Sequence, residues 1–127
     1  MMGKHWTTIC QRALLVLVLA PATAAATGGL DCRHPSPDPI AAGRCIALSA
    51  HLGNCTACHV IAGTSADGNL GPALRDMRRL FPNKIALFAE IYDPTILAPR
   101  TAMPPFGKYH ILTRGQIRKL VDFLWTL

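Results

Sequence analysis

Apolar and polar positions along this chain follow a helical period in several short segments and never alternate with the period of a strand. The clearest segment is residues 113–127, where Thr113 and Gln116 have the spacing of a capping box at a helix start. Apolar side chains then recur at helical spacing along one face: Ile117, Leu120, Val121 and Leu124. The pattern predicts an amphipathic helix that covers a core.

Three more short helices are predicted ahead of this one. Residues 39–52 are rich in Ala, begin with Pro39 in the first turn and are followed by Gly53. Residues 72–80 and 83–92 form two further helices, separated by Pro82. Residues 61–71 are a polar, Gly-containing loop, and residues 93–108, with four prolines, are an irregular but stiff loop. The expected fold class is therefore all-α.

The first 26 residues have the layout of a secretory signal. Lys4 and Arg12 precede an unbroken apolar run at 13–20, and small residues follow Pro21 at 22–26. A transmembrane anchor needs roughly 20 apolar residues, and this run is much shorter. We expect cleavage after Ala24 or Ala26, export to the periplasm and no membrane anchor afterwards. The domains are then a signal peptide at 1–26, a Pro-rich arm at 27–38 and one domain at 39–127.

The charge and size of the exported part limit the kinds of partner it can have. Without Lys4 and Arg12, 11 basic residues stand against 7 acidic ones, a net charge of +4. Outside the cytoplasm this balance favours an acidic protein partner or an anionic substrate, although a solvated basic surface accounts for it equally well. No basic and aromatic stacking pattern points to nucleic acid. About 100 residues give one domain with a thin core, which a cofactor or disulfide would help to stabilise.

A Cys-x-x-Cys-His pentapeptide carries the candidate chemistry. Cys55 and Cys58 are spaced so that each thiol can add to one vinyl group of a haem, and His59 then lies beneath the iron. In an exported protein this motif predicts one covalent haem c, with His59 as the first axial ligand.

Two more cysteines, Cys32 and Cys45, remain in the exported part. In an oxidising compartment an even pair predicts a disulfide between the arm and the first helix. Closing such a loop stabilises a fold by roughly 3 kcal/mol. A bond to a partner chain and a free thiol stay open as alternatives. A zinc site is disfavoured, because its ligands come in closely spaced pairs and these two residues are far apart.

A sixth ligand would close the iron to small molecules, and Met103 is the best candidate for it. Met103 lies 44 residues after His59 and is followed by Pro104 and Pro105, which stiffen the loop around it. Met77 is 18 residues after His59, within a charged helical turn where a methionine more often packs. The alternatives also include His110. Two further histidines of the exported part have other expected roles: His51 is expected to pack beside the haem, and His34 to be solvated.

These features together resemble class I cytochromes c over nearly the whole exported part. The resemblance rests on the short first helix, the pentapeptide, Gly71-Pro72, the methionine loop and the last helix. It implies that the Pro72 carbonyl accepts a hydrogen bond from His59. It also implies a close crossing of the first and last helices, with a notch of small residues and one filling side chain: Gly43, Ala47 and Ala50, filled by Leu124 or Trp125.

Three segments are more specific and are similar to SoxX, the monohaem subunit of the SoxAX cytochrome of thiosulfate oxidation. They are residues 53–59, residues 69–74, and Thr-Ala-Met-Pro-Pro-Phe-Gly at 101–107 followed by Ile-Leu-Thr at 111–113. The resemblance implies a heterodimer with a SoxA-like cytochrome that carries the catalytic residues of an L-cysteine S-thiosulfotransferase. There thiosulfate is joined to a carrier-protein cysteine, and the electrons released pass through this chain to a soluble cytochrome.

Two other functions remain open from the sequence. One is a free periplasmic class I cytochrome c with a partner outside the Sox system, because the haem motif would be the same. The other is an exported binding module without haem, in which the pentapeptide is accidental. The sequence shows no cluster of acid, base and nucleophile, so no catalytic residue is assigned to this chain itself.

Overall fold

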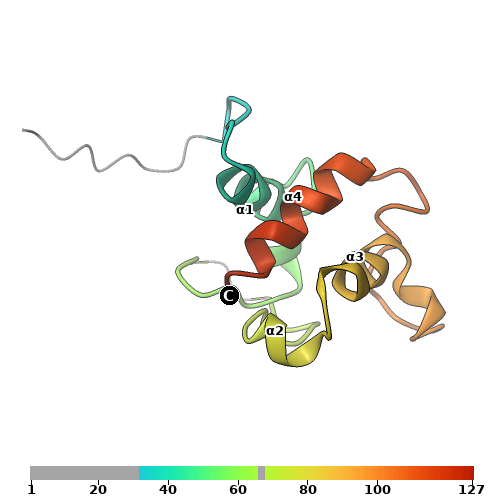
Figure 1. The fold of residues 1–127 in the computed structure, drawn as a ribbon. Coiled ribbons are helices and arrows are strands. Elements are labelled where there is room, and N and C mark those ends of the chain that lie inside the picture. The colour runs from blue at the N-terminus through green and yellow to red at the C-terminus, as the bar shows by residue number, and fades with distance from the viewer. Residues whose placement is uncertain (1–31, 66–67) are drawn as a thin grey trace, which may run out of the picture.

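A computed structural model describes residues 32–65 and 68–127 (Figure 1). Its helices are α1 (Pro39–Leu48), the 3-10 helix η1 (Cys55–Ala57), α2 (Met77–Leu80), α3 (Lys84–Tyr92), η2 (Pro94–Ile96) and α4 (Arg114–Leu124). Within the described ranges there is no strand, and extended pairing is limited to one isolated bridge between Ile61 and Leu74. The all-α prediction is confirmed.

The first and last helices cross in close contact and form the centre of the fold (Figure 1). Gly43 allows the approach, because a Cβ built there would lie 1.9 Å from the Lys119 carbonyl oxygen and 2.8 Å from the Phe123 Cβ. Ala47 is fully buried, as expected of the notch, whereas Ala50 is exposed beyond the end of α1. At Gly43 the α4 backbone and Phe123 lie against the notch, in place of the expected Leu124 or Trp125.

Helix α1 begins as predicted and ends earlier. Pro39 is its first residue, and the Asp38 carboxylate accepts hydrogen bonds from the backbone N–H groups of Ile40 and Ala41. The predicted end at residue 52 is wrong, because the helix stops at Leu48. The chain turns there, and the Gly53 N–H donates back to the Ile46 carbonyl at 2.9 Å. This turn delivers the pentapeptide directly beneath the helix.

The second predicted helix is also shorter than expected, while the third is close to its prediction. Residues 72–76 are not helical, because the Leu74 N–H donates to the Val60 carbonyl at 2.8 Å. That bond ties the segment to the chain after the pentapeptide, so α2 starts only at Met77. Helix α3 begins after Asn83, whose side chain caps the Ala86 N–H at 2.9 Å.

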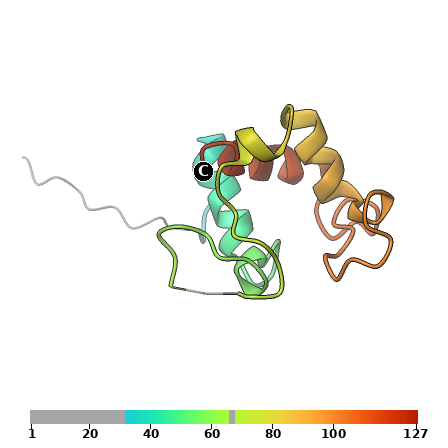
Figure 2. The same ribbon diagram turned by 90° about the horizontal axis from the view of Figure 1, so that it is seen from below.

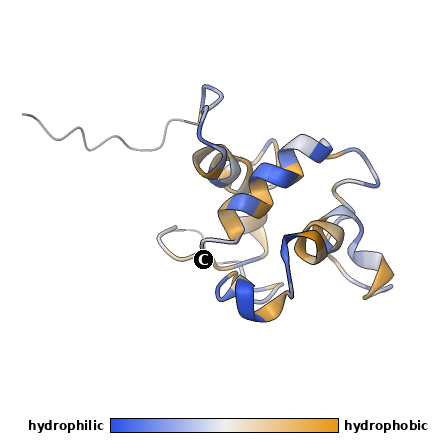
Figure 3. Ribbon diagram, viewed as in Figure 1, coloured by the Kyte–Doolittle hydropathy of each residue, from blue (hydrophilic) through white to orange (hydrophobic). Residues whose placement is uncertain are grey.

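Helix α4 has the predicted start and the predicted buried face, but it ends at Leu124 and not at residue 127. Thr113 and Gln116 form both bonds of the capping box. Hydrophobic and hydrophilic bands alternate along its turns (Figure 3). Its buried residues include the predicted four and Phe123: Ile117, Leu120, Val121, Phe123 and Leu124. They join residues of α1, α3 and the loops in one hydrophobic core.

A disulfide joins the start of the described chain to α1. Cys32 and Cys45 are bonded with a Cα–Cα distance of 5.2 Å, and Cys45 is buried in the helix. The predicted signal peptide, its cleavage site and the first part of the arm lie outside the described residues. Within residues 32–65 and 68–127, no helix combines the length and apolar character needed to cross a bilayer.

Candidate functional site

A large apolar cavity of about 630 Å³ lies against helix α4. The pentapeptide, the chain that follows it and the loop that carries Met103 all line this cavity. Figure 2 shows the pentapeptide segment and the Met103 loop on opposite sides of the molecule. Leu120 and Leu124 of α4 also line the cavity, with Leu87 and Ile91 of α3. Cys55, Cys58, His59 and Met103 all line this cavity. The structure thus brings together the residues that the sequence selected.

The pentapeptide is shaped by a tight turn. Asn54 has a left-handed backbone with φ of 46°, and η1 follows at Cys55–Ala57. The His59 N–H donates to the Cys55 carbonyl at 2.8 Å, which brings the histidine back under the first cysteine. Both thiols are half-buried, and neither is in a disulfide. The two sulfur atoms and the imidazole therefore meet the cavity along one short stretch of backbone.

The electrostatics of the first thiol argue against a redox dithiol. Burial raises the pKa of Cys55 to about 11. Cysteines that attack disulfides have a lowered pKa, because the thiolate is the nucleophile. A thiol that stays protonated at neutral pH instead suits a sulfur that ends as a thioether. The raised pKa of Cys55 therefore disfavours thiol–disulfide exchange at this residue.

The His59 ring is held by the backbone on its far side. Its Nδ1 donates to the Pro72 carbonyl at 2.7 Å, as the family resemblance implied. This bond fixes the tautomer and leaves the Nε2 lone pair free for a metal. Gly71 lies against the ring, and a Cβ built there would be 2.3 Å from its Cε1. The Gly71-Pro72 pair therefore sets both the position and the direction of the imidazole.

Replacing Gly71 by alanine should displace the His59 ring. The added methyl group would overlap the imidazole, so the Pro72 bond would lengthen or break. We expect a shifted reduction potential and a perturbed low-spin ferric spectrum in the purified haem protein, measured by potentiometry and electron paramagnetic resonance. Gly115→Ala is the matched control, because its Cβ would meet nothing closer than the Thr113 Oγ1 at 3.9 Å. Identical spectra for both variants would contradict the role of Gly71.

Met103 lies in the stiff loop at 93–108. Its backbone N–H donates to the Thr101 Oγ1 at 3.1 Å, and Pro104 follows it. Its side chain is half-buried and faces the cavity. Phe106, only 8% exposed, anchors the next turn of the loop in the core. The loop thus presents a thioether at a defined position without any regular helix.

The other candidate ligands are placed less well. Met77 also lines the cavity but is 2% exposed, packed in the hydrophobic core at the start of α2. His110 is exposed, has a left-handed backbone and does not line the cavity. His51 and His34 are exposed and away from the lining, so the expectation that His51 packs beside the cofactor finds no support.

The cavity suits a flat, largely apolar group. Three large hydrophobic side chains that are exposed to water line it: Leu70, Leu80 and Ile111. A bound macrocycle would cover such side chains, whose exposure to water is otherwise unfavourable. Among the residues that the structure describes, no group of three or more His, Cys, Asp or Glu side chains could hold a bare metal ion. The apolar lining, with one imidazole and one thioether facing it, suits an apolar group rather than a polar one.

Comparison with known families decides the assignment. A family model described as "Cytochrome C oxidase, cbb3-type, subunit III" matches residues 43–124, well over half of the chain. The chain belongs to this cytochrome c family. No curated protein matches it. The cytochrome c domain implies a covalently bound haem c, and Cys55, Cys58 and His59 fit its attachment site.

In this cytochrome c, several residues of the site escaped the sequence reasoning. Thr101 accepts a hydrogen bond from the Met103 N–H within the loop at 93–108, whose two ends are joined by the Asp93–Lys108 ion pair and by bonds to the Tyr92 carbonyl. Glu90 is a carboxylate that lines the haem cavity from α3. The Asp93-Pro94 dipeptide signals a capped turn, but nothing in the sequence pairs Asp93 with a lysine 15 residues later.

When bound, haem iron takes up and releases one electron by cycling between its ferrous and ferric states. The chain's own residues decide how that occurs. The two thiols would hold the group covalently, and His59, oriented by its bond to the Pro72 carbonyl, would offer Nε2 as a nitrogen donor. The apolar lining would keep water away from the bound group. This arrangement supports electron transfer.

Proposed function

We propose that this cytochrome c is the electron-transfer subunit of a SoxAX-type complex of thiosulfate oxidation in the periplasm, with His59 and Met103 as the axial ligands. The observation that carries the ligand set is the shared cavity, which both His59 and Met103 line. The Sox assignment rests on the sequence around Met103. Met-Pro-Pro-Phe-Gly at 103–107 and Ile-Leu-Thr at 111–113 are similar to SoxX.

The ligand set suits an electron acceptor. Methionine and histidine together raise the reduction potential of a haem relative to more electron-rich ligands. With both axial positions filled, the iron has no open site for thiosulfate. The bond between thiosulfate and a carrier-protein cysteine would therefore form on a SoxA-like partner, and its two electrons would leave one at a time through this chain. The chain belongs to the L-cysteine S-thiosulfotransferase without holding its catalytic residues.

The role of electron-transfer subunit implies three partners. The SoxA-like cytochrome forms a heterodimer with the chain, a soluble cytochrome takes the electrons onward, and the carrier protein is contacted through the complex. The basic surface of the exported part, with a net charge of +4, is compatible with an acidic partner.

Co-expression tests the proposal. The haem-loaded chain and a SoxA-like protein should elute together from a size-exclusion column as a stable heterodimer. A free class I cytochrome c of similar charge, offered to the same partner, controls for general electrostatic attraction, and repeating the run at high salt removes that attraction. If the chain elutes as a haem-loaded monomer beside the SoxA-like protein, it is a free electron carrier.

A further inference from the structure

The loop that carries Met103, residues 93–108, is called the methionine loop, and its two ends meet at the end of α3. Its two ends, Asp93 and Lys108, form an ion pair with an Nζ–Oδ2 distance of 2.8 Å. The Asp93 side chain is only 11% exposed, whereas that of Lys108 is 49% exposed. Met103 lies about two thirds of the way along the chain from Asp93 to Lys108. The pair therefore fixes the ends of a closed loop.

Asp93 serves both ends of this loop. Its Oδ1 accepts hydrogen bonds from the N–H and the hydroxyl of Thr95, which begin the loop, while its Oδ2 meets Lys108 at the end. The Asp93 N–H donates to the Ala89 carbonyl at 3.0 Å, so the carboxylate is mounted on α3. One largely buried side chain thus joins the start of the loop, its end and the helix behind it.

Tyr92 adds a second attachment beside the first. The carbonyl groups in the last turn of a helix lack partners within the helix. The Tyr92 carbonyl accepts from the N–H groups of Gly107 and Lys108, both at 3.1 Å. Gly107 lies against the Tyr92 ring, which is covered in turn by the guanidinium of Arg114 at 5.2 Å. The end of the loop is therefore held by α3 and, through Arg114, lies next to α4.

We propose that Asp93 and Lys108 act as positioning residues that keep Met103 on the haem iron, by closing the loop with an ion-pair clamp on the end of α3. This inference rests on Met103 as the axial ligand. A thioether binds iron weakly, so the loop's own free energy of closure decides how often the ligand leaves. Opening the clamp should release Met103 without unfolding the α1–α4 crossing.

The charges of the clamp persist over the neutral range. The hydrogen bonds from Lys108 and Thr95 hold the pKa of Asp93 below its usual value, and Asp93 raises the pKa of Lys108. The carboxylate's contribution to stability is present above its unfolded pKa and is lost as the pH falls through the folded one. The contribution of the lysine is present below its unfolded pKa and is lost as the pH rises through the folded one.

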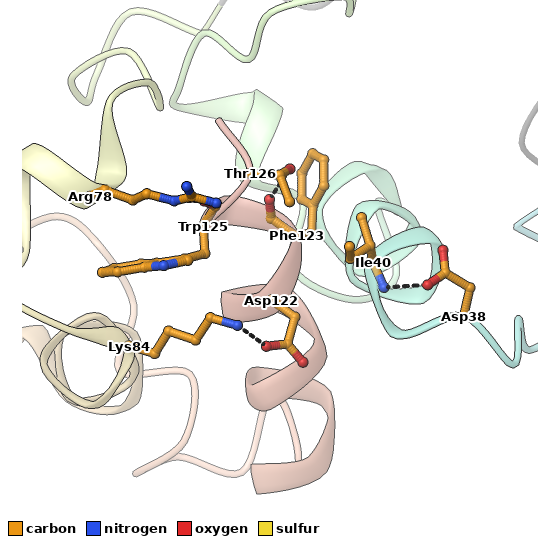
Figure 4. A network of polar contacts seen from close by, with 8 residues as sticks. All are labelled: Asp38, Ile40, Arg78, Lys84, Asp122, Phe123, Trp125 and Thr126. Atoms are coloured by element: carbon orange, nitrogen blue, oxygen red, sulfur yellow. Dashed lines mark hydrogen bonds and ion pairs between the residues drawn. The ribbon is translucent and has the colours of Figure 1, made fainter.

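The structure offers a matched control in a second ion pair. Lys84 and Asp122 join α3 to α4 with an Nζ–Oδ1 distance of 2.8 Å (Figure 4). The Lys84 side chain is 49% exposed, the same fraction as that of Lys108. This pair is outside the methionine loop, so Lys84→Gln removes the same charge and the same kind of contact without touching the clamp.

Imidazole measures how often the iron position opens, because it competes with Met103 in the ferric protein. We expect Lys108→Gln to lower the apparent Kd for imidazole roughly three- to tenfold. The loss of the Met–Fe(III) charge-transfer band during the titration measures imidazole binding. Lys84→Gln should stay within about twofold of the wild type, and Lys108→Arg should restore wild-type affinity. Asp93→Asn combined with Lys108→Gln should give no larger change than either alone, because both remove one interaction.

Three results would overturn the proposal. Unchanged imidazole affinity in Lys108→Gln, with the band present in the wild type, refutes the clamp and leaves Met103 as the ligand. An equal rise in imidazole affinity in Lys108→Gln and Lys84→Gln assigns the effect to net charge or to general stability. Urea unfolding, monitored by Trp125 fluorescence, distinguishes these two causes, because only a general loss of stability lowers the unfolding midpoint. A wild-type ferric protein without the band refutes Met103 as the ligand and the clamp's role with it.

Discussion

Replacing Met103 by alanine should abolish the Met–Fe(III) charge-transfer band and lower the reduction potential of this cytochrome c. The alanine leaves the sixth position to water or to a stronger donor, and either stabilises the ferric state relative to a thioether. We expect a fall on the order of 100 mV, within the roughly 0.8 V that axial ligands span. Absorption spectroscopy of the ferric protein and a potentiometric titration measure the two effects.

Met77→Leu is the matched control for this experiment. Leucine conserves the volume of a buried methionine and so costs little stability, while it removes the other thioether that lines the cavity. It should keep both the band and the potential. If the band survives in Met103→Ala and disappears in Met77→Leu, the ligand is Met77. If the wild type lacks the band and both variants keep its spectrum, His110 becomes the candidate.

Gly43→Ala should cause a larger loss of stability than any of the other substitutions proposed above. The new Cβ would lie 1.9 Å from the Lys119 carbonyl oxygen, a backbone atom that no rotamer change can move. Helices α1 and α4 would have to separate, which costs about 3 kcal/mol by the scale of overpacked cores. For a domain of this size that loss lowers the Tm by about 10–20 °C. Thermal unfolding of the haem-loaded protein, followed by circular dichroism, measures it.

Gly115→Ala separates the crossing from helix propensity. Gly115 lies in the first turn of α4, and its Cβ would meet open space apart from the Thr113 Oγ1 at 3.9 Å. Alanine there should leave stability unchanged or raise it by about 0.5–1 kcal/mol, because glycine is the poorer helix former. A similar destabilisation in both variants would mean that the tight approach at Gly43 is not what limits the fold.

The sequence predicted a helix start correctly where residues within one turn of that start determine it. The capping box of Thr113 and Gln116 and the Asn83 cap are complete within one turn, so their residues suffice to place α4 and α3. The predicted end of α1 was wrong because the bond from Gly53 to the Ile46 carbonyl forms as part of a turn. That turn competes with a sequence that would otherwise continue as a helix.

The site, too, was predictable only where neighbouring residues in the sequence determine it. The pentapeptide fixes three attachment residues by their spacing alone, and the two prolines after Met103 mark a stiff loop. The partners that hold the loop could not be found, because Lys108 meets Asp93 only through the path of the chain between them. The side chain at the helix crossing was also missed. Helix α4 is buried on two sides, so Phe123 meets α1 while Leu124 lines the cavity.

The α1–α4 crossing has a consequence for biogenesis. It joins segments from opposite ends of the domain, with the pentapeptide and the methionine loop between them. Contacts of such long sequence separation form late, because the intervening chain must first lose its conformational freedom. During synthesis the pentapeptide would therefore emerge well before α4, the helix that roofs its cavity. For that interval the two thiols lie on an open chain, where an enzyme that attaches haem can reach them.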